Sequence, residues 1–215
     1  MKYALLILFS CMFFGHAQQL RDSLQSTIDL KEVTVSSLQA TSETPMAFSN
    51  LTKEELSERN LGVDMPILLQ FIPGTVSTSD AGAGICYTGI RVRGSDATRI
   101  NVSINGIPYN DAESQGTFWV NLPDFGSSVG SLQLQRGVGT SMNGAGAFGA
   151  SINLTTDRIS DSSYVQLANG FGSFNTRKHS VMFSTGLISN QFELSGRLSK
   201  ICLLYTSDAA DDVLC

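Results

Sequence analysis

Three glycines, Gly144, Gly146 and Gly149, match the GxGxxG spacing of the dinucleotide-binding fingerprint. That fingerprint needs a helix that opens at the glycines, because the helix N-terminus then faces the pyrophosphate. Here the chain continues into residues 151–155, SINLT, where polar and apolar residues alternate as in a strand. We therefore expect Gly144 and Gly149 to permit close backbone packing, and we expect no nucleotide site.

Side chains that could carry acid–base, nucleophilic or metal chemistry are sparse. Beyond the first 17 residues the only histidine is His179, and nothing places a serine on a nucleophile elbow near it. Asp111 and Glu113 are close in sequence, but two acids in a loop are usually solvated. Histidine, cysteine and carboxylate residues do not cluster at metal-ligand spacing. The sequence predicts a protein that is not an enzyme and binds neither a metal nor another cofactor.

The first 17 residues read MKYALLILFSCMFFGHA. Lys2 precedes an apolar run, and Gly15 and Ala17 supply a small-x-small cleavage pattern. These are the features of a secretory signal peptide, and the segment is too short to be a spanning helix.

Residues 202–215 begin CLLYTSDAAD, which looks like the in-frame translation of a sequencing-library adapter. We therefore expect the native chain to continue past Ile201, with a genuine acidic tail as the alternative. The formal net charge of −5 comes from 14 basic and 19 acidic residues. This last segment holds three of the acids, and 14 − 16 leaves −2 without it. The chain has no basic footprint for nucleic acid, and we expect no nucleic-acid partner.

Two short helices are predicted before the first strong strand pattern. Thr52 and Glu55 form a capping box, which indicates a helix from there to about Arg59. Asp64 can cap a second helix that ends at Pro73-Gly74. The buried side of this second helix is expected to consist of Ile67, Leu68, Leu69 and Phe71.

Short strands follow, in which apolar and polar residues alternate. The alternation covers residues 90–94, 100–104, 131–136 and 152–154. Asn105-Gly106 is the strongest hairpin-turn pattern in the chain. Short helices and strands mixed over roughly a hundred residues are typical of a small α+β domain.

From Tyr164 onward the pattern changes to longer alternating segments. Phe192, Leu194, Gly196 and Leu198 alternate with polar residues, and the run around Val181 does so less strictly. Antiparallel segments of about ten residues with one apolar face are typical of membrane β-barrel strands. A soluble β-meander is the alternative, which the period alone does not exclude.

The order of these elements resembles the plug domain of TonB-dependent outer-membrane receptors. The resemblance implies an α+β plug domain, a small mixed sheet with short helices, over residues 41–158. The first antiparallel strands of a transmembrane β-barrel would follow over residues 159–201. The residues that match the plug motif are Arg91, Arg93, Gly94, Arg99, Asn105, Gly106, Pro108, Arg136, Gly137, Gly144 and Gly149.

In that family the plug gates a barrel that imports a scarce nutrient, such as a ferric siderophore, haem or cobalamin, in the outer membrane of Gram-negative bacteria. The implied partners are the TonB protein, outer-membrane lipid and the nutrient. Residues 18–40 form an N-terminal extension, in which a TonB-box-like segment comprises Leu30, Lys31, Glu32, Val33, Thr34 and Val35. A partner captures such a segment by strand addition. A secreted or periplasmic β-rich binding protein without transport activity is the alternative.

The resemblance also assigns roles to two loops and four arginines. Residues 79–87 and 110–119 match the apical loops that touch ligand, and the candidate contacts are Tyr87, Tyr109, Asn110, Phe118 and Trp119. Ordinary packing within the plug is the alternative for the aromatic residues. We interpret Arg91, Arg93, Arg99 and Arg136 as forks that bind carboxylates and carbonyls of the barrel wall. Solvent-facing strand charge is the alternative for these arginines.

Overall fold

The computed structural model describes residues 39–139, 143–144, 146–156, 159–173, 175–189 and 191–203. The predicted signal peptide and the TonB-box-like segment lie outside the described residues, as does most of the adapter-like segment. In the part of the chain that is described, no helix is long and apolar enough to cross a membrane.

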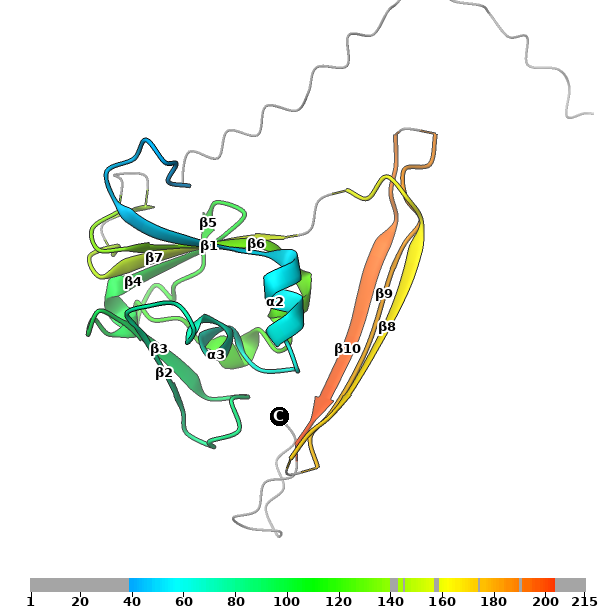
Figure 1. Cartoon of the computed structure of the whole chain (residues 1–215), viewed down its shortest axis with the longest axis horizontal. Helices are drawn as coiled ribbons and strands as arrows, with labels where there is room; N and C mark the ends of the chain where they lie inside the picture. The colour runs from blue at the N-terminus through cyan, green and yellow to red at the C-terminus, as the bar shows by residue number, and fades with distance from the viewer. Residues whose placement is uncertain are drawn as a thin grey trace, which may run out of the picture. The chain divides into compact units, whose positions relative to one another are not determined.

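A five-stranded mixed sheet, with the order β1-β6-β7-β4-β5, is the frame of the first domain (Figure 1). β1 (Ala47–Thr52) and β7 (Ala150–Thr156) both pair antiparallel with β6 (Val129–Arg136). β7 pairs in parallel with β4 (Ile100–Ile104), which forms a hairpin with β5 (Ile107–Pro108). This arrangement confirms the predicted α+β fold with a small mixed sheet.

The predicted hairpin turn lies between β4 and β5. Asn105 and Gly106 both have positive φ, at 51° and 85°. These are the backbone angles that a two-residue type I′ turn requires, and they are the reason that Asn-Gly is favoured there. The Asn105 side chain also accepts a hydrogen bond from the Thr156 backbone N–H at 3.0 Å, which ties the turn to the end of β7.

The first predicted helix is confirmed as α2 (Lys53–Arg59). The Glu55 backbone N–H donates to Thr52 Oγ1 at 3.4 Å, and the Thr52 N–H donates to Glu55 Oε2 at 2.9 Å. This reciprocal pair is the predicted capping box. It satisfies two backbone donors that the first turn of a helix leaves without partners.

The second helix, α3 (Met65–Leu69), ends before the predicted stop at Pro73-Gly74. Leu68 and Leu69 are buried, but Phe71 is 61% exposed, so its predicted burial is wrong. The helix ends two residues before Phe71, which takes that side chain off the buried face. Its ring instead lies 5.0 Å from the guanidinium carbon of Arg59, within the range of a cation–π contact.

The hydrophobic core lies on one face of the five-stranded sheet. Neighbouring strands place Leu134, Ile152 and Val102 in one cross-strand row, all buried. The helices α2 and α3 add Leu56 and Leu68 to the same cluster. Burial of these apolar side chains is the main force that holds the helices against the sheet.

The opposite face of the sheet is polar and is also buried. Gln133, Asn153 and Ser103 form the adjacent cross-strand row, and each is at most 5% exposed. The alternating sequence pattern predicted half-buried strands with a solvated polar face. The polar face is instead covered, because Ala40 and Asn143 pack over it through hydrogen bonds to glutamine side chains.

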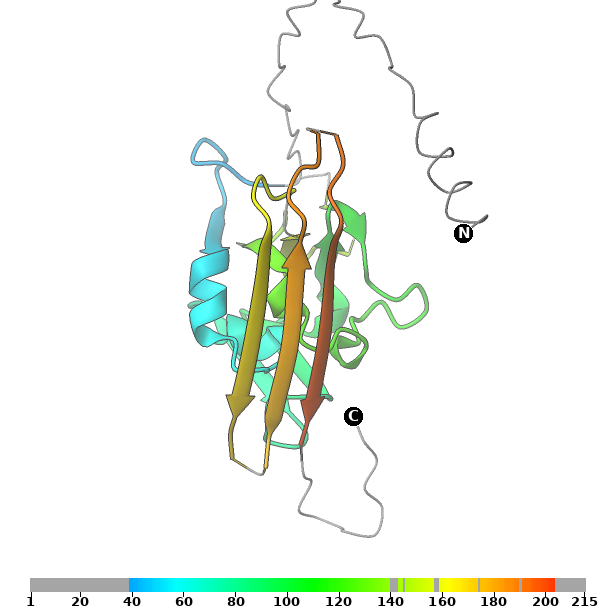
Figure 2. The same cartoon turned by 90° about the vertical axis from the view of Figure 1, so that its right-hand side faces the viewer.

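A second, three-stranded antiparallel sheet has the order β10-β9-β8, and Figure 2 shows its strands side by side. Its strands are β8 (Tyr164–Phe171), β9 (Arg177–Ser184) and β10 (Ser195–Cys202), each of eight residues. One face is apolar and exposed, with Val165, Leu167, Phe171 and Leu198. These strands confirm the predicted antiparallel segments. The predicted alternation included Phe192 and Leu194, but β10 begins only at Ser195. A β-bridge between Ile188 and Phe192 places Phe192 in the preceding loop.

The GxGxxG segment leads into strand β7, as the alternation predicted, and not into a helix. Gly149 donates its N–H to the Arg99 carbonyl at 2.8 Å. A Cβ atom there would lie 2.4 Å from Ser95 Cβ and 3.1 Å from Arg99 O. Gly149 therefore permits a close backbone approach.

Replacement of Gly149 should destabilise the fold, because its neighbours are backbone and the short Ser95 side chain. We expect Gly149→Ala to lower the free energy of unfolding by about 1–3 kcal/mol, the usual cost of overpacking. Urea unfolding can be followed by the fluorescence of Trp119, the only tryptophan of the chain. Gly146→Ala is the matched control, because a Cβ at Gly146 meets nothing within 4 Å. Equal urea midpoints for the two variants would contradict the packing role of Gly149.

Candidate functional site

The two loops that were predicted to face a ligand lie together around one open groove. The hairpin of β2 (Thr75–Ser79) and β3 (Thr88–Val92) forms one side, and residues 117–120 form the other. The groove has a volume of about 250 Å³. The hairpin loop is held by hydrogen bonds from the Asp80 N–H to the Tyr87 carbonyl at 3.1 Å and from the Gly84 N–H to Ser79 Oγ at 3.0 Å.

Three of the five candidate contact residues line this groove. Tyr87 and Phe118 are 66% and 50% exposed, whereas Trp119 is 2% exposed and belongs mainly to the core. Threonines 78, 88 and 117 contribute polar lining, and Asp80 is the only charged residue in the lining. An open groove with aromatic rings and a few hydroxyl groups is a typical setting for a small ligand.

The other two candidates lie elsewhere. Tyr109 is partly buried against the hydrophobic core. Asn110 supports the loop: its Oδ1 accepts from the Val102 N–H at 2.7 Å, and its Nδ2 donates to the Gln115 carbonyl at 2.9 Å. Asn110 thus sets the conformation of the loop that carries Phe118.

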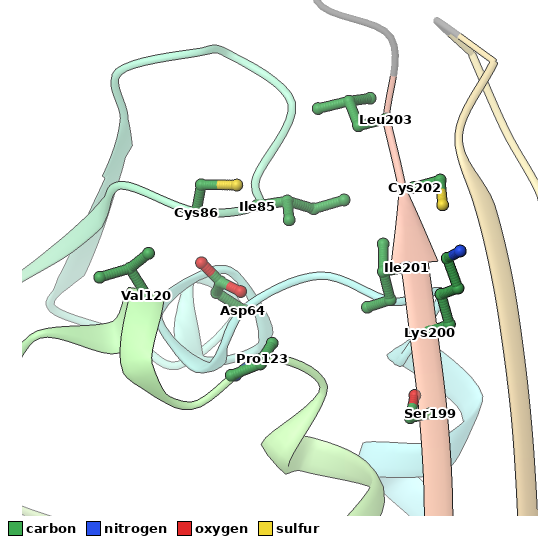
Figure 3. A pocket seen from close by; sticks show the side chains of 10 residues that line it. All are labelled: Asp64, Ile85, Cys86, Val120, Pro123, Ser199, Lys200, Ile201, Cys202 and Leu203. Atoms are coloured by element: carbon green, nitrogen blue, oxygen red, sulfur yellow. The ribbon is translucent and has the colours of Figure 1, made fainter. Parts of the chain in front are cut away.

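A second cavity, of about 270 Å³, lies between the first domain and β10 (Figure 3). Figure 3 shows the Asp64 carboxyl group close to Ile85 and Val120, with Ile201 on the opposite wall. Its strand side includes residues 202 and 203 of the adapter-like segment, so only the side formed by the first domain bears on function.

Asp64 was predicted to cap α3, but its side chain makes no capping hydrogen bond. The carboxylate accepts a hydrogen bond from Thr88 Oγ1 at 2.9 Å and thereby links α3 to the hairpin under the groove. Burial raises the pKa of Asp64 to about 6, although the hydrogen bonds from Thr88 and from the backbone of Cys86 act in the opposite direction. Buried carboxyl groups favour the neutral form for this reason.

Asp124 joins the first domain to the three-stranded sheet. Its carboxylate is buried and accepts from Lys178 Nζ of β9 at 2.7 Å and from Arg197 Nη1 of β10 at 2.9 Å. Ser127 Oγ donates at 2.6 Å, and Ser199 Oγ of β10 donates as well. We call Asp124, Lys178 and Arg197, with the two serines, the charge hub.

The charge hub is a well-paired set of buried charges. Burial tends to raise the pKa of Asp124, but the hydrogen bonds from Lys178, Ser127 and Ser199 outweigh it and hold the pKa below its ordinary value. Lys178 Nζ also donates to Ser127 Oγ at 3.1 Å and to Asn60 Oδ1 at 3.4 Å. The carboxylate is therefore charged, and the lysine has a partner for each of its three N–H groups.

The charge hub was not predicted from the sequence. The expected contact was between arginines of the first domain and carboxylates of the wall, whereas here the domain supplies the carboxylate and the strands supply the cations. Two clues were present: Lys178 and Arg197 both stand at polar positions of alternating strands. The sequence does not show that these residues pair, because Asp124 is 54 residues from Lys178 and 73 from Arg197.

Two of the four arginines of the plug motif, Arg136 and Arg99, make side-chain contacts within the first domain. Arg136 donates to the Pro73 carbonyl at 3.0 Å and to Ser49 Oγ at 3.1 Å. The guanidinium carbon of Arg99 lies 5.9 Å from the ring centre of Phe148. Arg91 lies on an exposed position of β3, and Arg93 has a φ of 51° in the turn after it. Contact of these arginines with barrel-wall carboxylates stays a prediction.

The remaining motif residues shape turns and strand ends. Gly94, Gly137 and Gly144 have positive φ, and Pro108 pairs with Ser103 at the edge of the sheet. The Gly137 N–H donates to the Gly149 carbonyl at 2.8 Å and closes the Gly-rich loop, residues 138–148. Among the described residues, no group of three or more histidine, cysteine or carboxylate side chains could hold a metal ion.

Comparison with known proteins assigns the family. The sequence model of the TonB-dependent receptor plug domain matches residues 40–151, more than half of the 215 residues. The chain belongs to the TonB-dependent receptor plug domain family. A comparison with curated proteins gives no match.

Solved structures of siderophore receptors have a similar fold. The pyoverdine outer membrane receptor FpvA from Pseudomonas aeruginosa PAO1 has 17% identity and a TM-score of 0.58, over 74% of this chain and 22% of that one. The siderophore receptor PiuA from Acinetobacter baumannii has 17% identity and a TM-score of 0.57, over 77% and 22%. The ferric yersiniabactin uptake receptor FyuA from Yersinia pestis has 17% and 0.52, over 74% and 24%. The chain thus spans about a quarter or less of their lengths.

Removal of the carboxylate from the charge hub should loosen the plug. Asp124→Asn leaves Lys178 and Arg197 without their counter-charge, and one-sided loss of a buried ion pair costs about 3–5 kcal/mol. We expect a clearly lower urea midpoint, measured by Trp119 fluorescence. The exposed Asp161→Asn is the control and should change the free energy of unfolding by about 0.5 kcal/mol or less. A D124N midpoint as high as that of the control would show that the hub contributes nothing.

The raised pKa of Asp64 makes stability depend on pH. Between its ordinary pKa of 3.8 and the folded value of about 6, the folded chain keeps a proton that the unfolded chain has released. The contribution of Asp64 to stability is therefore full below pH 3.8 and is lost as the pH rises to about 6. We expect Asp64→Asn to remove this decline in a series of urea midpoints.

Thr88→Val provides a second test of the same group. The substitution removes a hydrogen bond that lowers the pKa of Asp64, so the decline of stability with rising pH should extend to higher pH. An Asp64→Asn profile identical to that of the parent chain between pH 4 and 6 would refute the assignment.

Proposed function

We propose that the chain is the N-terminal part of a TonB-dependent outer-membrane receptor that imports a scarce nutrient, with the plug gating the barrel. The observation that carries this proposal is the two-sided sheet β8–β10. Its inner face supplies Lys178 and Arg197 to the buried Asp124 of the plug, and its other face carries an exposed apolar patch. A barrel wall has this division, with lipid on one side and a polar lumen on the other.

The apolar outer face separates this proposal from the alternative of a soluble binding protein. Val165 and Leu167 of β8 pair with Phe183 and Val181 of β9, and Val181 pairs with Leu198 of β10, so these five residues form a continuous set, and all are exposed. Large exposed apolar patches mark protein or membrane contacts. A soluble periplasmic β-meander would carry polar residues at these positions.

The cargo that we favour is a ferric siderophore, with haem and cobalamin as other members of the same class of scarce nutrients. The solved structures of similar fold include receptors for pyoverdine and for ferric yersiniabactin. In this chain the groove offers Tyr87 and Phe118 as exposed rings and the exposed Thr78 beside them. These groups suit a compact ligand that has both flat apolar surface and oxygen acceptors.

TonB is the partner that the proposal assigns to residues Leu30–Val35. Strand addition depends on backbone hydrogen bonds, so it tolerates many sequences but requires the backbone N–H groups. The segment lies a few residues before Gln39 and Ala40, where the described contacts with the plug sheet begin. Tension on it would therefore act directly on the plug. The plug itself would supply no catalytic group.

Proline in the box provides the test, because proline has no N–H to donate to an added strand. In the full-length receptor, we expect Val33→Pro to reduce cross-linking between a cysteine at Thr34 and TonB by at least tenfold. Energy-dependent accumulation of ferric siderophore should fall with it. Binding of the siderophore to the outside of the cell should stay unchanged, because the groove is intact.

The matched control is Ser23→Pro, which places the same residue upstream of the box. It should leave both cross-linking and uptake at the level of the parent receptor. No cross-link between the parent receptor and TonB, in cells that contain TonB and the siderophore, would exclude the proposed partner. Cross-linking without uptake of any ferric siderophore would leave the class of transporter intact and exclude the cargo.

A further inference from the structure

The buried polar face of the plug sheet contains two glutamines of β6 that solvent does not reach. Gln133 and Gln135 are 3% and 0% exposed, and both point away from the hydrophobic core. A buried primary amide is costly unless its donors and acceptor are paired. The partners of these two amides therefore indicate what they hold in place.

Gln133 holds the backbone of Ala40. The Ala40 N–H donates to Gln133 Oε1 at 2.6 Å, and Gln133 Nε2 donates to the Ala40 carbonyl at 2.9 Å. The side chain thus pairs with both main-chain groups of one residue, as a neighbouring strand would. Gln133 Nε2 also donates to Asn50 Oδ1 of β1 at 2.8 Å. Ala40 is buried by this contact and lies 93 residues from Gln133 in sequence.

Two further side-chain hydrogen bonds connect the amide of Gln133 to the Gly-rich loop. Gln135 Nε2 donates to Gln133 Oε1 at 2.8 Å, and Asn143 Nδ2 donates to Gln135 Oε1 at 2.7 Å. Asn101 of β4 donates in turn to the Asn143 carbonyl. From Asn143 through Gln135 to Gln133, each side-chain amide nitrogen donates to the oxygen of the next residue in the series. We call the side chains of Gln133, Gln135 and Asn143 the amide chain.

We propose that Gln133 is a positioning residue, and that it holds the segment at Ala40 on the plug. We further propose that the amide chain couples release of this segment to the Gly-rich loop. The inference rests on the proposed function, in which tension on residues 30–35 reaches the plug through Ala40. Among the described residues, Ala40 is where the N-terminal segment first pairs its main chain with the sheet.

The coupling follows from how buried amides exchange partners. When Ala40 leaves, Gln133 loses one donor to its oxygen and one acceptor for its nitrogen. Gln133 can recover them only if it turns or meets water, and either change disturbs its bond with Gln135. Hydrogen bonds in a connected buried set strengthen one another, so the loss of one member weakens the next. Release at Ala40 and loosening of Asn143 should therefore favour each other.

Cysteine accessibility at position 40 tests the inference. In the full chain carrying Ala40→Cys, we expect Gln133→Met to speed maleimide labelling by roughly 10- to 100-fold, the change expected for the loss of two buried hydrogen bonds. Methionine keeps the length of the side chain but cannot donate or accept in the same way. Asn143→Ala should speed labelling by about threefold or more, through Gln135 alone. The same variants with Ala40 intact give the background from other cysteines.

Two further measurements keep the result specific. Gln70→Met removes an exposed amide and should leave labelling at residue 40 unchanged. Trp119 fluorescence, recorded on the same samples, should stay native, which separates local release from unfolding of the core. Unchanged labelling in Gln133→Met, or labelling that rises only together with a Trp119 change, would overturn the role of Gln133. Unchanged labelling in Asn143→Ala would overturn the coupling. The assay contains neither TonB nor ligand, so it remains decisive if the transport proposal fails.

Discussion

The arrangement of the plug against the strands depends on one buried carboxylate. Asp124 lies in a left-handed turn between two short helical segments and takes a lysine from β9 and an arginine from β10. A buried charge is tolerated only with close partners of opposite sign. This requirement fixes which residues of the strands face the plug. Because side chains alternate along a strand, it also fixes which residues face outward. The apolar outer face of the sheet is therefore the counterpart of the charged inner one.

The plug sheet follows a related rule on its polar face. Strands β6 and β7 are central, and both of their faces are covered. One face is apolar and packs on α2 and α3. The other carries glutamine, asparagine and serine. On this face, Gln133 pairs with both main-chain groups of Ala40, and Asn101 donates to the Asn143 carbonyl. The N-terminal segment and the Gly-rich loop can therefore lie on the sheet without joining it as strands.

Local patterns predicted the features that local contacts determine. The capping box at Thr52, the turn at Asn105-Gly106 and the strand after Gly149 each depend on residues a few positions apart, and each is confirmed. Phe71 was misplaced because α3 ends early, and no neighbouring residue signals that end. The charge hub and the amide chain were missed for a different reason. Asp124 is 54 and 73 residues from its cationic partners, and Ala40, which the amide chain holds, is 93 residues from Gln133. Alternation shows that a residue is polar but not what covers it.

The chemistry of these contacts suits a domain that must be held firmly and yet be released by tension. An apolar core resists separation over its whole area, because water must reach every buried carbon atom at once. A hydrogen bond is local, and a chain pulled from one end breaks such bonds in sequence, each with a net cost of about 1 kcal/mol. In this plug the core lies on the face of the sheet away from Ala40, whereas side-chain hydrogen bonds hold the N-terminal segment at Gln39 and Ala40. Tension applied at the N-terminus would therefore meet the separable contacts first and the cohesive core last.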